Sequence, residues 1–226
     1  MGYNAVLLSS MSPYNNLRVM KEMHDKIQEM FVREFGTKRP TVGYIDSGYD
    51  ENFRQFRWIR KLFKIMFKIE NVYFLDLTER YSKHAEDRVL GCDVIFLAGG
   101  NTFDFLLYLK YRGTLERLRE VKKEKIFIGT SAGAIMCTSD IIIAGFADEN
   151  RTAMKNFKSL GLTKIAFKPH FDDWIQHKES FKAFSEIAEK TVYGCYEGSG
   201  IIIDNGVLSE HGPMFKAELG KTIKEQ

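Results

Sequence analysis

The residues with the clearest chemical meaning are Gly129-Thr130-Ser131-Ala132-Gly133, which match the nucleophile-elbow motif G-x-S-x-G. In such an elbow a strand turns sharply into a helix, so bulky neighbours of the serine would collide. The run KIFIG before Ser131 predicts the strand, and AGAIMC after it predicts the helix start. The hydroxyl would lie at a strand's carboxyl end, and the Ala132 amide could donate to an oxyanion. The alternative is a small-residue turn without chemistry.

A second glycine pair, Gly99-Gly100, ends an apolar run and is followed by Asn101-Thr102-Phe103. Bare backbone amides at this point could hold an anion, but the glycine patterns of phosphate- and dinucleotide-binding loops are absent. The pair could instead supply the second arm of an oxyanion hole facing Ser131. A helix cap by Asn101 or Thr102 is the structural alternative, and it is compatible with that role.

A serine nucleophile needs a base, and one histidine follows a strand-like run. Lys168-Pro169-His170 places an imidazole where proline stops the strand. His211, after a later strand, is the rival base. The other histidines lie on helical or charged stretches: His24, His84 and His177.

The base needs an acid that orients it. Glu197 lies between two predicted strands and beside a glycine, where a carboxylate is costly to bury without a partner. A hydrogen bond to a histidine would supply that partner. Asp148, Asp172 and Asp173 are alternatives, each with a solvated loop as its default environment.

The elements that must position these residues alternate between strands and helices. Apolar runs predict strands at 5–10, 40–46, 71–77, 92–100 and 125–131, and spacings of three and four predict helices at 14–35, 53–66 and 101–124, the last interrupted at Gly113. Strands that are apolar throughout are typical of a parallel sheet covered on both faces. The order indicates an α/β fold with a mostly parallel sheet.

After residue 138 the pattern becomes strand-rich. Strands are predicted at 141–145, 165–171, 191–197, 200–204 and 206–212, with one helix at about 175–189. Asp204-Asn205-Gly206 indicates a hairpin over 200–211. The chain shows no linker or internal repeat, so we expect a single domain over 1–226.

Composition limits the classes of function. Lys and Arg number 33 against 30 Asp and Glu, a net charge of +3 that argues against a nucleic-acid binder. The cysteines Cys92, Cys137 and Cys195 form no C-x-x-C pattern, which indicates reduced thiols and no zinc site. We expect a cytoplasmic protein, because no signal peptide or membrane-length apolar run is present.

The ordered motifs AGGNTF (98–103), GTSAGA (129–134), PHF (169–171) and EG (197–198) resemble peptidase family S51, the aspartyl dipeptidase (dipeptidase E) and cyanophycinase group. The resemblance implies a three-layer α/β sandwich related to class I glutamine amidotransferases. It also implies a monomer or homodimer that acts on small peptides and needs no metal or cofactor.

The resemblance further implies roles for individual residues. Ser131 would be the nucleophile, His170 the general base and Glu197 the third member, with Asp148 a weaker alternative for that place. The oxyanion donors would be the amides of Ala132 and of Gly99 or Gly100.

One part of the family pattern is missing. Aspartyl dipeptidases read the substrate's aspartate with a basic residue after the histidine, and segment 172–184 has no arginine. Lys178 and Lys182 are available, but lysine does not match the bidentate geometry of arginine.

Three functions are therefore compared. The first is a serine peptidase that cleaves short peptides, including aspartyl dipeptides. The second is an α/β-hydrolase-type esterase with His211 as base, for which little sequence follows Ser131. The third is a binding protein of the same fold without catalysis.

Overall fold

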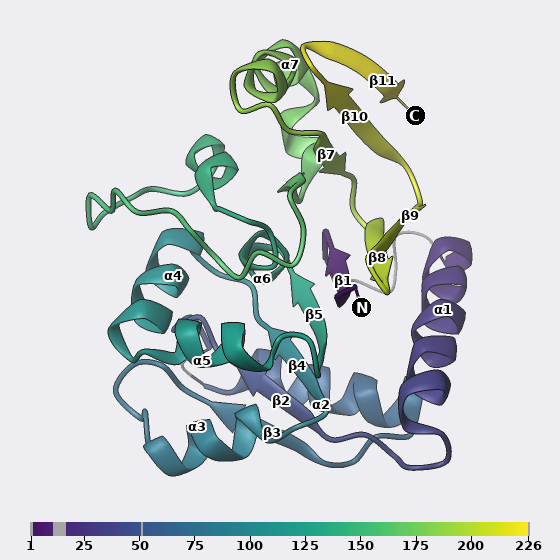
Figure 1. Ribbon diagram of the computed structural model, residues 1–226, viewed down its shortest axis with the longest axis vertical. Coiled ribbons are helices and arrows are strands. Elements are labelled where there is room, and N and C mark those ends of the chain that lie inside the picture. The colour runs from purple at the N-terminus through teal and green to yellow at the C-terminus, as the bar shows by residue number, and fades with distance from the viewer. Residues whose placement is uncertain (1, 11–16, 51, 226) are drawn as a thin grey trace.

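A seven-stranded, mostly parallel sheet runs through the larger part of the molecule (Figure 1). The computed structural model describes residues 2–10, 17–50 and 52–225, except for the side chains of Leu17 and Met20. From edge to edge the strands are β3 (Val72–Leu75), β2 (Val42–Ile45), β4 (Val94–Leu97), β5 (Ile126–Thr130), β1 (Asn4–Leu8), β8 (Gly200–Asp204) and β9 (Val207–His211). The first five strands are parallel to one another. β8 runs antiparallel to β1, and β9 runs antiparallel to β8. The predicted α/β fold class is confirmed.

Helices cover both faces of this sheet, as the apolar strands predict. One face packs against α1 (Leu17–Phe35) and α2 (Arg54–Phe67), and the other lies under α3 (Lys83–Leu90), α4 (Thr102–Tyr111), α5 (Thr114–Val121) and α6 (Ala132–Met136). Alternation along β1 separates the two cores, because Val6 joins the first and Leu7 the second. None of the described helices is long and apolar enough to cross a bilayer.

A smaller, four-stranded sheet lies at the C-terminal end of the molecule (Figure 1). Its order is β11 (Lys221–Glu225), β10 (Met214–Glu218), β7 (Val192–Cys195) and β6 (Ala166–Lys168), and α7 (Lys178–Ile187) packs against it. Its apolar face is continuous with one of the two cores. The strand-rich part of the chain thus divides between two sheets, since β8 and β9 join the larger one.

Some predicted elements differ from the structure. The strand predicted at 141–145 is wrong: Ile142–Phe146 form a 3-10 helix. Isoleucines favour a strand only beside a partner strand, whereas here the turn buries Ile141 and Ala144 together and leaves Ile142 47% exposed. Three elements were not predicted, namely α3, β10 and β11. The predicted helix at 14–35 begins at 14–16, outside the described residues.

The predicted hairpin over 200–211 is confirmed. Asn205 and Gly206 connect β8 to β9 with φ angles of 51° and 82°, as a two-residue hairpin turn requires. The helix predicted at 101–124 is divided at Gly113, whose φ is 72°, into α4 and α5. The helix predicted at 175–189 starts with a 3-10 segment, Phe171–His177, before α7.

Strand register brings the ends of several strands to one edge. Gly129 pairs with Leu97 and also with Leu7, so β5, β4 and β1 end together. In the smaller sheet β6 and β7 are parallel, with Lys168 opposite Gly194. The segments that follow these strands therefore converge, and they carry the residues singled out by the sequence.

Candidate active site

Ser131 occupies a strained turn between β5 and α6. Its backbone angles are φ 53° and ψ −118°, a combination that a non-glycine residue rarely adopts. A Cβ atom on Gly129 would lie 2.3 Å from the Gly133 carbonyl oxygen, and one on Gly133 would lie 2.1 Å from the Leu97 carbonyl oxygen. The small residues of the motif are thus required by the close approach of the backbone, and the local geometry is that of a nucleophile elbow.

His170, two residues after β6 of the smaller sheet, lies against Ser131, which follows β5 of the larger sheet. Its Nε2 is 3.0 Å from Ser131 Oγ. The His170 backbone is in the left-handed region, with φ 56°. Its N–H donates to Ser9 Oγ at 2.8 Å, and the Ser9 hydroxyl donates to the Cys195 carbonyl at 3.0 Å. Ser9 is fully buried, so it fixes the histidine backbone to the ends of β1 and β7.

Glu197 contacts the other ring nitrogen of this histidine. Glu197 Oε1 forms a hydrogen bond with His170 Nδ1, and the side chains of Glu197 and His170 are 27% and 37% exposed. The Glu197 backbone N–H donates to Asp172 Oδ2 at 2.7 Å. Ser131, His170 and Glu197 thus form a continuous chain of hydrogen bonds.

The other candidate acids have different partners. Asp148 accepts a hydrogen bond from the Thr102 backbone N–H at 2.8 Å, which places its carboxylate at the start of α4. Asp172 holds the Glu197 backbone. Neither of these two carboxylates hydrogen-bonds to a histidine in the described part of the chain.

The two glycines after β4 lie in different surroundings. A Cβ atom on Gly99 would be 3.4 Å from Ser131 Cβ and 3.9 Å from its Oγ, so Gly99 borders the serine. Gly100 has φ 140°, and a Cβ there would be 2.2 Å from Ser47 Oγ. Asn101 caps α4 by accepting from the Phe103 and Asp104 amides, as the sequence suggested. Ala132 is the first residue of α6, so its N–H has no partner within the helix.

A hollow of about 600 Å³ opens beside Ser131 and His170. Its walls come from the ends of β1, β4 and β5 and from α2, and the lining residues include Gly99, Tyr44, Arg54, Gln55 and Trp58. The two lysines considered as carboxylate readers are in ion pairs instead: Lys178 with Glu225, and Lys182 with Glu179.

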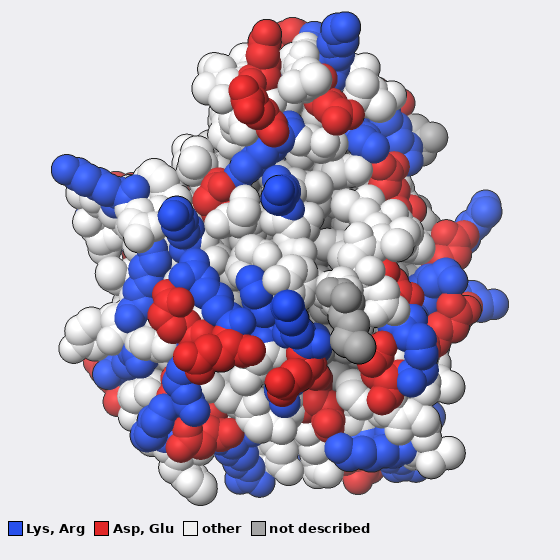
Figure 2. Space-filling view, in the orientation of Figure 1, with Lys and Arg blue, Asp and Glu red and all other residues white. Residues whose placement is uncertain are grey.

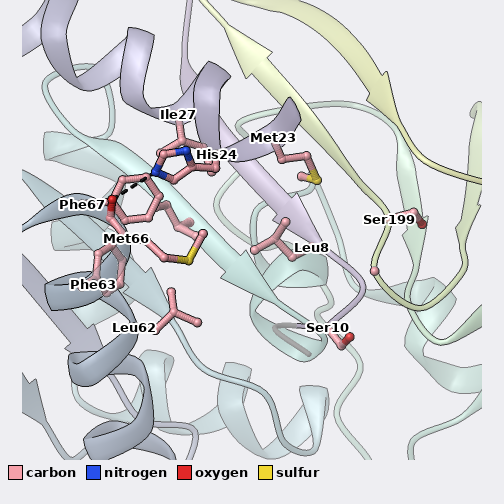
Figure 3. Close-up of a pocket in the computed structure, with 12 residues that line it drawn as sticks. Leu8, Ser10, Met23, His24, Ile27, Leu62, Phe63, Met66, Phe67 and Ser199 are labelled. Atoms are coloured by element: carbon pink, nitrogen blue, oxygen red, sulfur yellow. Dashed lines mark hydrogen bonds between the residues drawn. The ribbon is translucent and has the colours of Figure 1, made fainter. Parts of the chain in front are cut away.

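A separate apolar recess lies between α1, α2 and the sheet (Figure 3). Met23, Leu62, Phe63 and Met66 face it, and Ser10 lines both the recess and the hollow. Its volume of about 50 Å³ is a third of that of a cavity that holds benzene (about 150 Å³). The recess is too small for a peptide, which leaves the hollow as the space beside Ser131.

Burial shifts the pKa of two other titratable groups near the site. Burial lowers the pKa of Lys168 to about 8, partly opposed by Asp148 and Asp173, and its Nζ donates to the Pro169 carbonyl at 3.2 Å. Burial raises the pKa of Cys195 to about 12, so the thiol is protonated at neutral pH. No metal-binding cluster of three or more His, Cys, Asp or Glu is present in residues 2–10, 17–50 and 52–225.

His211 lies away from this chain of hydrogen bonds. Its Nε2 is 2.9 Å from Ser209 Oγ, two residues earlier on β9. Burial lowers the pKa of His211. The esterase hypothesis required His211 beside Ser131, and the structure pairs it with Ser209 instead.

Ser9 is a contact of the site that we did not predict. Ser9 lies within the strand predicted at 5–10 and directly follows β1 in the structure, so a signal was available: it is a polar residue at the same sheet edge as Ser131.

Comparison with known proteins identifies the family. Residues 6–210 match the model of peptidase family S51. The chain is 33% identical over 144 residues to peptidase E of Salmonella arizonae, and 32% identical over 103 residues to an uncharacterized peptidase of Listeria monocytogenes. These matches cover 55% and 44% of this chain, and only 59% and 46% of those relatives.

Solved structures support the same assignment of fold. A crystal structure described as a peptidase E protein of Listeria monocytogenes matches 93% of this chain and 98% of its own, with a TM-score of 0.65 and 22% identity. A peptidase from an acI-B1 actinobacterium matches 99% of this chain and 97% of its own, with a TM-score of 0.63 and 13% identity. The family model covers most of the sequence, and the chain therefore belongs to peptidase family S51.

Proposed function

We propose that the protein is a serine peptidase that hydrolyses short peptides, with Ser131 as nucleophile, His170 as general base and Glu197 as the residue that orients the base. The observation that carries the proposal is the 3.0 Å contact of Ser131 Oγ with His170 Nε2, made by a serine in a strained elbow. The relatives named peptidase E and the family membership support the same reaction class.

The proposed mechanism is acyl transfer. Ser131 Oγ attacks the peptide carbonyl carbon while its proton passes to His170 Nε2. The protonated histidine then donates that proton to the departing amine, and an acyl-enzyme forms. Water, deprotonated by His170, attacks the ester and releases the acid and the serine. Glu197 accepts the Nδ1–H throughout, which fixes the tautomer and stabilises the imidazolium.

The negative charge on the attacked carbonyl oxygen needs donors. We assign this role to the amides of Ala132, at the start of α6, and Gly99, which borders Ser131. Gly100 is the weaker candidate for an oxyanion donor, because its α-carbon lies against Ser47. Each such donor typically contributes about 10²–10³ in rate.

The hollow supports short peptides as substrates. Its volume of about 600 Å³ lies within the range of small-molecule sites, roughly 300–1,000 Å³. Residues from both sheets surround the reacting atoms, so we treat the chain over 1–226 as one functional unit. Preference for aspartyl peptides has no support from Lys178 or Lys182, which are in ion pairs.

A dipeptide library tests the proposal. We expect the wild type to release free amino acids from some dipeptides, and a folded Ser131→Ala variant to release none above background. Turnover that persists in Ser131→Ala would contradict the proposal, as would a folded wild type that cleaves no dipeptide. Circular dichroism and thermal unfolding of both proteins provide the control for folding.

A further inference from the structure

One face of α2 borders the hollow beside Ser131. Arg54, Gln55, Trp58 and Ile59 line it, and their spacing places them on one side of the helix. Arg57 and Arg60 are also exposed on α2, but neither lines the hollow. The helix thus offers one arginine to the hollow and comparable arginines outside it.

The described side chains that line the hollow carry positive charge only. Among its described lining residues Arg54 is the one Lys or Arg, and none is Asp or Glu. Arg54 has no hydrogen bond or ion pair with any described residue. Elsewhere on the surface positive and negative side chains are mixed, as the face in Figure 2 shows. An anion in the hollow would therefore meet a guanidinium that no described residue neutralises.

The end of α2 itself does not bind such an anion. Asp50 is buried and accepts from the backbone amides of Gln55 and Phe56 at 3.0 and 2.8 Å. The helix N-terminus is therefore already satisfied by a carboxylate. What remains for a ligand is the Arg54 side chain, with the indole of Trp58, 40% exposed, one turn further along.

We propose that Arg54 binds a carboxylate group of the peptide, with Trp58 against the apolar part of the residue that carries it. This inference rests on the proposed function, because it names the substrate class as peptides with a free carboxylate close to the cleaved bond. A guanidinium pairs with a carboxylate through two parallel hydrogen bonds, which suits it to this task. The carboxylate is either the peptide's C-terminus or an acidic side chain.

Binding to an inactive variant tests the inference without catalysis. In the Ser131→Ala protein, calorimetry measures the dissociation constants of Ala-Phe, its C-terminal amide, and Asp-Phe amide, whose carboxylate is on the side chain. Arg54→Gln is added in one protein and Arg57→Gln in the matched control.

We expect Arg54→Gln to weaken binding of a carboxylate-bearing peptide about tenfold, the scale of one charge-assisted contact near the surface. Arg57→Gln should change it less than about twofold. Loss confined to Ala-Phe identifies the C-terminal carboxylate, and loss confined to Asp-Phe amide identifies the side chain. Equal effects of the two substitutions, or no binding of any of the three peptides, would overturn the inference.

Failure of the proposed function would be seen separately. If binding depends on Arg54 but the folded wild type hydrolyses no member of the dipeptide library, the carboxylate site stands and the peptidase assignment falls. In an active wild type, Arg54→Gln should raise KM about tenfold with little change in kcat, because the contact binds substrate and transition state alike.

Discussion

Two serine–histidine contacts of almost equal length lie in different regions of the fold. Ser131 Oγ is 3.0 Å from His170 Nε2 where the two sheets meet, and Ser209 Oγ is 2.9 Å from His211 Nε2 on β9. Ser209 and His211 are two residues apart on one strand and share a face for that reason alone. Ser131 and His170 are brought together from β5 and the end of β6.

The surroundings separate the two pairs. Glu197 contacts the far ring nitrogen of His170, and Ser131 starts a helix beside Gly99. In the described part of the chain no carboxylate hydrogen-bonds to His211, and Ser209 lies in regular antiparallel backbone. A short serine–histidine distance is therefore insufficient for a nucleophile. The orienting acid, the strained turn and the amides distinguish the proposed active site.

The largest difference should appear when the serines are replaced. We expect Ser131→Ala to lower kcat/KM on a cleaved dipeptide by at least about 10⁴-fold, because nucleophile and base act as a unit. Ser209→Ala should retain activity within about twofold. Steady-state kinetics give kcat/KM for both variants. A comparable loss of kcat/KM in Ser209→Ala would contradict the distinction between the two serines.

The next largest effect concerns the acids. We expect Glu197→Gln to lower kcat by about 10³–10⁴-fold, since an amide no longer holds the required tautomer of His170. Glu210→Gln is the matched control, because Glu210 is next to His211 but pairs with Lys216 and Lys224. Full activity of Glu197→Gln would show that the carboxylate does not orient the base, and Asp148 would have to be examined instead.

A smaller loss of activity is expected when Ser9, which accepts a hydrogen bond from the His170 backbone, is replaced. Ser9→Ala leaves the His170 N–H and the Cys195 carbonyl without their partner in a buried position. We expect a loss of about 1–3 kcal/mol in the free energy of unfolding. A small displacement of His170 should also lower kcat about tenfold. Urea unfolding and kinetics test both, and unchanged values in both would contradict the positioning role.

The smallest effect concerns pH and His211. Burial lowers the pKa of His211 below 6.5 in the folded protein, so below about pH 6.5 the unfolded chain binds more protons. The wild type should therefore lose stability through this group as pH falls from 7.5 to 5.5. His211→Gln should reduce that loss and leave kcat/KM within about twofold. Urea unfolding at both pH values measures it, and an unchanged or steeper loss in the variant would refute the attribution.

The fold and the site differ in how much the sequence could predict. Strands buried on both faces, such as Val94–Leu97, carry an apolar signal in their own residues. Gly129 is specified by a clash with the backbone of Gly133 four residues later, so the elbow motif was recognisable in the sequence. The roles of Ser131, His170 and Glu197 remain predictions, although the structure places their side chains in contact.

What sequence reasoning missed depends on distant partners. Ser9 accepts the His170 N–H across 161 residues, and its polar character at the end of β1 did not identify that distant partner. The 3-10 helix Ile142–Phe146 was mistaken for a strand because it begins within a run of three β-branched isoleucines (141–143), and the missing partner strand leaves no local trace. Arg54 could not be singled out from the sequence of α2, because Arg57 and Arg60 are the same residue type. Only the structure shows that Arg54 lines the hollow and that the other two do not.

Active-site labelling tests the central claim most directly. The folded wild type is treated with a fluorophosphonate, and the modified peptide is identified by mass spectrometry. We predict one adduct, on Ser131, that is lost in His170→Ala and retained in His211→Ala. Modification of Ser209, labelling that survives without His170, or no adduct on the folded protein would contradict the account.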